Sequence, residues 1–140
     1  MVVLSEARDT TKDVDAVLLE ADRRPEVRHA ALEVARELGL PEDWLNEGAK
    51  GYLHGLDLGE VVLERPTLVV QAVSPAQLLA MKLSAWRDDL DIADARLLLW
   101  KLQGERDEVW AAVEPFLVPG RELKAQYAFA DLWEAERGAE

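Results

Sequence analysis

The chain has 140 residues, the usual size of one domain, and with 49% hydrophobic and 31% charged residues it has the composition of a globular protein. Its net charge of −12 argues against general DNA or RNA binding, because affinity for phosphate backbones depends on Lys and Arg contacts. The lack of cysteine excludes disulfides and Cys-based zinc sites, and two distant histidines, His29 and His54, disfavour a His-rich metal centre or a catalytic triad.

No apolar run approaches the ~18 residues of a membrane span, and the first residues lack the pattern of a signal peptide. We therefore expect no membrane partner and a cytoplasmic location. We expect one domain over residues 1–140, with a strand-containing part (1–73) and a helical part (74–140).

The first half of the chain alternates strand and helix signals. Residues 10–19 run from polar into apolar and predict a strand, and residues 25–38 predict a helix that Gly39 ends. Residues 41–46 are typical of a short helical turn, and a loop punctuated by glycines follows. Residues 60–65 and 67–73 predict two adjacent strands, parted by a proline.

The second half predicts helices only. Ser74 and Pro75 are typical of a helix cap and first turn, and this helix extends to about residue 86. Asp88 or Asp89 then caps a helix that ends near residue 103. Two further helices are expected at 106–116 and 120–136, with these core candidates: Trp110, Val113, Phe116, Leu123, Tyr127, Ala130 and Trp133. The predicted fold is α+β, with a small mixed or antiparallel sheet packed on helices and a helical C-terminal half.

The candidate site with the most chemical content is the pair Asp13 and Asp15. Alternate residues of a strand share a face, so the two carboxylates would stand on one side of the first predicted strand, about 7 Å apart along it. That spacing suits Mg²⁺ held against a nucleoside triphosphate. In a chain with 28 acidic residues, a solvated strand edge is the simpler interpretation of such a pair.

A second candidate is Lys82 with the charged run at residues 87–94. These residues favour either helix caps and an Arg87–Asp91 pair, or a positive site in which Lys82 and Arg87 face phosphates. A third candidate is the glycine-rich segment with Lys50, Tyr52 and His54 (the residues between 48 and 55). It is either a substrate-contacting loop or a connection that carries one packed aromatic side chain.

Three segments together resemble a family of small bacterial nucleotidyltransferase-like proteins. RDTTKDVD (8–15) is similar to that family's R-x-T-x-D-[IV]-D segment, with either one extra residue after Thr10 or Thr11 as the matching threonine. PEDWLN (41–46) resembles its lPxDWLN turn, and SPAQLLAMKLSAWRDDLDI (74–92) resembles its spexLLamKlxAxRxrDxxDi segment.

The resemblance implies a DNA-polymerase-β-type nucleotidyltransferase fold. Related proteins occur in bacterial toxin–antitoxin and phage-defence pairs, and some transfer a nucleotide to a protein or RNA hydroxyl. Carried over, Asp13 and Asp15 are the catalytic metal ligands for Mg²⁺. The nucleotide contacts carried over are Lys82, Arg87, Thr11 and Lys12. The implied partners are a nucleoside triphosphate and either a toxin protein or a second copy of the chain.

Two features of the sequence depart from the family pattern. Family members have a Gly-Gly or Gly-Ser turn before the first strand, and no such turn precedes residues 8–15 here. We therefore expect residues 1–4 to continue a helix that begins upstream. The third carboxylate of the family is expected on a later strand, where residues 68–73 offer only Gln71.

Three hypotheses follow from the sequence. The first is a Mg²⁺-dependent nucleotidyltransferase, and the second is a catalytically inactive interaction module with the same fold. The third is a domain in which Asp13 and Asp15 only terminate a strand edge. The nucleotide and its acceptor are not identified by any of these patterns.

Overall fold

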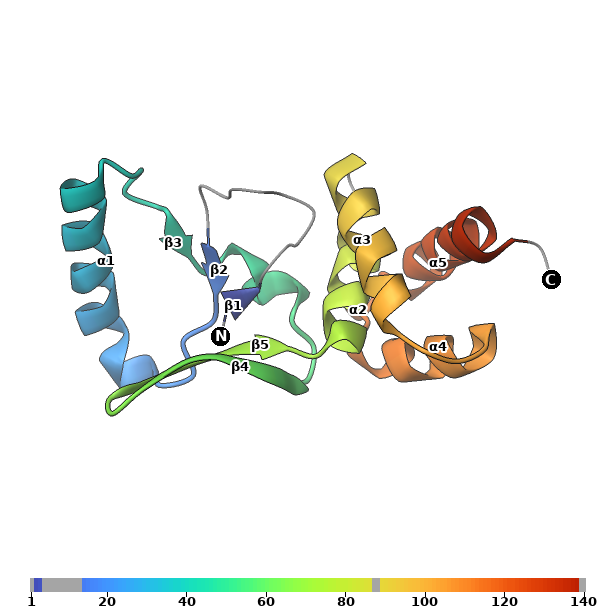
Figure 1. The fold of residues 1–140 in the computed structure, drawn as a ribbon, viewed down its shortest axis with the longest axis horizontal. Helices are drawn as coiled ribbons and strands as arrows, with labels where there is room; N and C mark the ends of the chain where they lie inside the picture. The colour runs from blue at the N-terminus through green and yellow to red at the C-terminus, as the bar shows by residue number, and fades with distance from the viewer. Residues whose placement is uncertain (1, 4–13, 87–88, 139–140) are drawn as a thin grey trace.

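The computed structural model of the chain describes residues 2–3, 14–86 and 89–138. These residues form an α+β fold with a helical C-terminal half, as predicted. The strands form two small sheets, whereas one sheet was predicted. In Figure 1 the helices α2 to α5 gather at one end of the molecule, while the sheets and helix α1 make up the other end.

The first sheet is mixed and has the strand order β1-β2-β3. Strand β1 (Val2–Val3) runs antiparallel to β2 (Val14–Ala16), and β2 runs parallel to β3 (Leu45–Asn46). The predicted helix over residues 1–4 is therefore wrong at Val2 and Val3, which are extended. Two consecutive β-branched residues favour an extended backbone, and pairing with β2 stabilises it.

The short helical turn predicted for residues 41–46 is also corrected. Only a turn forms at its start, and the segment then becomes β3. The Trp44 carbonyl accepts a 2.6 Å hydrogen bond from the Val14 N–H, and the Trp44 indole donates one of 2.8 Å to the Ala31 carbonyl. These long-range bonds hold Trp44 between α1 and the sheet, so tertiary pairing overrides the local turn preference.

Helix α1 (Arg24–Leu38) matches the predicted range and follows a 3₁₀ turn, η1 (Ala21–Arg23). Pro25 stands in its first turn, where the missing N–H costs nothing. Gly39 ends the helix with a φ of 67°, a left-handed conformation that glycine adopts without a Cβ penalty. The helix buries only two alanines, Ala31 and Ala35.

The second sheet is an antiparallel hairpin of β4 (Leu58–Arg65) and β5 (Leu68–Val73), which confirms the predicted strand pair. At its base the Ser74 N–H donates to the Asp57 carbonyl at 2.8 Å. From there the hairpin extends away from α2 toward the α1 end of the molecule (Figure 1). Five apolar side chains of the hairpin are between 43% and 54% exposed: Leu58, Val61, Val62, Leu68 and Val69.

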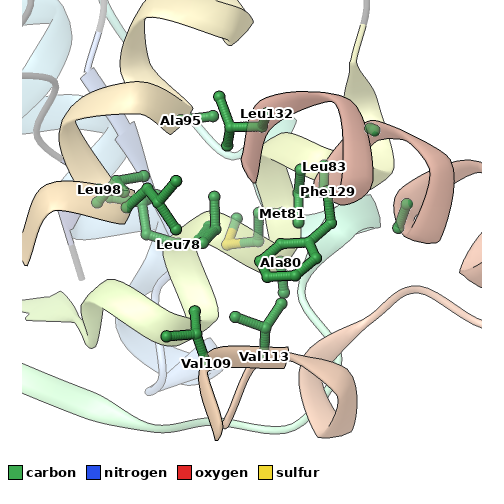
Figure 2. Close-up of a cluster of buried hydrophobic side chains, with 14 of the residues drawn as sticks. Leu78, Ala80, Met81, Leu83, Ala95, Leu98, Val109, Val113, Phe129 and Leu132 are labelled. Atoms are coloured by element: carbon green, nitrogen blue, oxygen red, sulfur yellow. The ribbon is translucent and has the colours of Figure 1, made fainter. Parts of the chain in front are cut away.

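The core of the protein lies in the helical half. Helix α2 (Pro75–Ala85) is its centre, surrounded by α3 (Asp89–Lys101), α4 (Arg106–Val113) and α5 (Glu122–Arg137). Figure 2 shows how side chains from all four helices converge, among them Leu78, Leu83, Leu98, Val109, Val113, Phe129 and Leu132. The predicted cap is confirmed, because the Ser74 hydroxyl accepts a hydrogen bond from the Gln77 N–H.

Two predicted core residues of α5 lie on the surface. Leu123 and Tyr127 are 64% and 67% exposed, whereas Ala125, Phe129 and Leu132 are buried. Residues 125, 129 and 132 follow helical spacing along the face that meets α2, so positions 123 and 127 fall on the outer face.

Candidate functional site

Of the two aspartates in the predicted site, the structure describes Asp15, which lies in the middle of β2. It pairs in register with Val3 of β1 on one side and with Asn46 of β3 on the other. Its side chain is half-buried. The mixed sheet therefore holds Asp15 from both neighbouring strands, and the residue is part of a paired strand rather than a loop.

The carboxylate of Asp15 borders the start of the 3₁₀ segment η2 (Gly48–Tyr52). Its Oδ1 lies 3.6 Å from the position that a Cβ on Gly48 would take, and Asn46 Oδ1 lies 2.9 Å from that position. The same Asn46 oxygen accepts a 2.9 Å hydrogen bond from the Gly48 N–H. A Cβ at position 48 would therefore crowd the Asn46 side-chain oxygen, whereas it would make only an ordinary van der Waals contact with the Asp15 carboxylate.

Glu47 lies between β3 and η2 and connects this part of the mixed sheet to the N-terminal end of α1. Its carboxylate accepts hydrogen bonds of 3.2 Å from the Leu18 N–H and from the guanidinium of Arg24, and Arg28 approaches to 3.9 Å. Burial works to raise the pKa of Glu47, but the bond from Leu18, the bond from Arg24 and the charges of Arg24 and Lys50 together lower it. Glu47 therefore stays ionised and stabilises the connection between β2, β3 and α1.

Several predicted site residues lie outside the described residues: Asp13, Thr11, Lys12 and Arg87. The arrangement of Asp13 beside Asp15 and the phosphate contacts assigned to Thr11, Lys12 and Arg87 therefore remain predictions. The structure does describe Lys82, the remaining residue of the predicted site.

Lys82 is engaged with two buried carboxylates of α3. Its ammonium donates a 2.6 Å hydrogen bond to Asp94 and lies 3.6 Å from Asp91. The Lys82 side chain is 19% exposed, and both aspartates are 3% exposed. Asp91 and Asp94 are three residues apart in the sequence, and this spacing places both aspartates on the same, buried face of α3. The sequence did not indicate that these two aspartates pair with Lys82.

The later strand and the glycine-rich segment have structural contacts of their own. The Gln71 amide donates to the Gly59 carbonyl at 3.0 Å, which ties β5 to β4. Tyr52 packs partly buried against the helical core, with the Arg121 guanidinium 5.3 Å from its ring centroid. His54 is exposed. Tyr52 is therefore the packed aromatic side chain of this segment, while a substrate contact by the segment stays a prediction.

A separate hollow of about 450 Å³ lies between α4 and α5. Aromatic and aliphatic side chains (Trp110, Leu123, Tyr127 and Phe129) and polar ones (Arg106, Asp107 and Gln126) line it.

Within residues 2–3, 14–86 and 89–138, no three His, Cys, Asp or Glu side chains gather as a metal site. Comparison of the chain with family models, curated proteins and solved structures gave no match. No helix of the described part of the chain is long and apolar enough to cross a membrane.

Proposed function

We propose that the chain is a nucleotidyltransferase-like protein that binds a nucleoside triphosphate and Mg²⁺ at the strand of Asp13 and Asp15. The observation that carries the proposal is the position of Asp15. Its half-buried side chain lies on a paired strand in register with Asn46, and both side-chain oxygens border Gly48 at the start of η2. Carboxylate and amide oxygens are the hard ligands that suit Mg²⁺.

The reaction proposed for this site is nucleotidyl transfer. A protein or RNA hydroxyl releases its proton to water and its oxygen forms a bond to the α-phosphorus, while the bond from that phosphorus to the pyrophosphate oxygen breaks and pyrophosphate leaves. Bound Mg²⁺ would neutralise charge on the phosphates. Asp15 would supply an oxygen ligand from a backbone position that β1 and β3 hold from both sides.

The test is label transfer from nucleoside triphosphates that carry ³²P at the α-position, with Mg²⁺ and with added RNA or protein acceptors. We expect transfer by the wild-type chain and its loss in Asp15→Asn. The matched control is Asp131→Asn, which removes an exposed carboxylate on α5. Transfer that persists in a double variant Asp13→Asn/Asp15→Asn, or none by the wild type, would contradict the proposal.

A second candidate function, an interaction module without catalysis, has one observation in its favour. The hairpin exposes apolar side chains on both strands, including Val61 and Val69, and two paired strands alone rarely form a stable structure in water. Exposed apolar surface of this kind marks interaction sites.

This second candidate is tested by light scattering of the purified chain over a range of concentrations. A mass above the monomer's 15.7 kDa that persists in Asp15→Asn and returns to the monomer in Val69→Lys would support it. A monomer at every concentration, together with nucleotide binding, would contradict self-association through the hairpin.

A further inference from the structure

Segment η2 lies directly beside the Asp15 strand, and its one lysine has a fixed backbone and an exposed side chain. The Lys50 N–H donates to the Glu47 carbonyl at 3.0 Å, and the Lys50 carbonyl accepts from the Leu53 N–H at 3.2 Å. Tyr52 and Leu53 pack against the helical core. The backbone at Lys50 is thus held from both ends while its ammonium faces solvent.

The other described lysines have partners within the fold. Lys82 is paired with Asp94 and Asp91, and the Lys124 ammonium donates to the Ala85 carbonyl at 3.1 Å. Among the ion pairs between described residues, none engages Lys50. Lys50 follows Gly48 by two residues on the same 3₁₀ segment, and a Cβ on Gly48 would lie 3.6 Å from the Asp15 Oδ1.

A triphosphate that shares one Mg²⁺ with a protein still carries excess negative charge, which cationic side chains commonly neutralise. Lysine serves this purpose as a compact charge on a flexible stem. We propose that Lys50 binds the phosphates of the nucleotide held at Asp15. This inference rests on the proposed function and assigns a phosphate-binding cation to Lys50 on η2, whereas Lys82 is paired within the fold.

The test is calorimetric titration of the full chain with MgATP, MgGTP, MgCTP and MgUTP in turn. For the nucleotide that binds, we expect Lys50→Ala to weaken binding about tenfold, the loss of one charge-assisted contact. Lys50→Arg keeps a cation at this position and should stay within about threefold of the wild type. The matched control, Lys101→Ala, removes the same charge from the end of α3 and should bind as the wild type does.

The outcomes separate this inference from the function on which it rests. Wild-type affinity in Lys50→Ala, with binding lost in Asp15→Asn, would overturn the role of Lys50 and leave the Asp15 site standing. Equal weakening in Lys50→Ala and Lys101→Ala would overturn it as well, because the effect would then be one of net charge. A wild-type chain that binds none of the four nucleotides would overturn both.

Discussion

The ammonium of Lys82 on α2 donates a 2.6 Å hydrogen bond to the carboxylate of Asp94 on α3. Both side chains are largely buried, at 19% and 3% exposure, so this ion pair lies at the contact of the two helices. Asp91 is 3.6 Å from the same ammonium. Lys82 therefore compensates carboxylates that would otherwise be costly to bury at the start of α3.

Removal of the cation should destabilise the fold. We expect Lys82→Met to lower the free energy of unfolding by about 3 kcal/mol, since it leaves a buried carboxylate without its lysine. Urea denaturation measures this change. The double variant Lys82→Met/Asp94→Leu should recover part of the loss, because Asp91 stays buried without its lysine. Glu33→Gln, which breaks an exposed contact with His29 on α1, should leave the midpoint unchanged. A Lys82→Met variant as stable as the wild type would show that the pair contributes nothing.

The lowered pKa of Glu47 predicts a specific pH dependence. A carboxyl group whose pKa is lower in the folded state stabilises the fold above its unfolded pKa, near 4.5, and this contribution disappears as the pH falls through the folded pKa. We expect Glu47→Gln to be less stable than the wild type at pH 7, with a difference that shrinks below about pH 4.5. Urea denaturation of both proteins from pH 7 to pH 3 measures it. A difference that is constant over this range would contradict the account.

Two glycines should respond in opposite ways to alanine. A Cβ on Gly59 would lie 3.0 Å from the Val73 carbonyl oxygen and 3.2 Å from the Ser74 backbone, whereas a Cβ on Gly51 would meet no atom within 4 Å. Gly59→Ala should therefore destabilise the fold by about 1–3 kcal/mol, as overpacking does. Gly51→Ala should be neutral or slightly stabilising. Thermal unfolding of the two variants compares them, and equal midpoints would show that the hairpin base is not closely packed.

The parts of the fold that were predicted are those whose signals are local. Pro25 and Gly39 mark the ends of α1, and Ser74 caps α2, because each acts through its own backbone conformation or a neighbouring N–H. The α+β class followed from these signals together with the apolar hairpin strands.

What the sequence did not reveal depends on long-range pairing. Strand β3 has two residues and exists because Leu45 and Asn46 pair with β2, while their own sequence favours a turn. The partners of Lys82 are 9 and 12 residues away along the chain and meet it only when α3 folds back on α2. Lys50 stood out in its glycine-rich segment, but the place of that segment beside the Asp15 strand depends on the packing of η2 against β2.

The most direct test of the proposed site is metal binding in the presence of nucleotide. Mn²⁺ replaces Mg²⁺ at oxygen-rich sites and can be followed by electron paramagnetic resonance. We predict that the wild-type chain binds Mn²⁺ together with a non-hydrolysable triphosphate, that Asp15→Asn loses this binding, and that Asp131→Asn keeps it. Equal Mn²⁺ binding by the wild type and Asp15→Asn, or none by the wild type, would contradict a metal–nucleotide site at this strand.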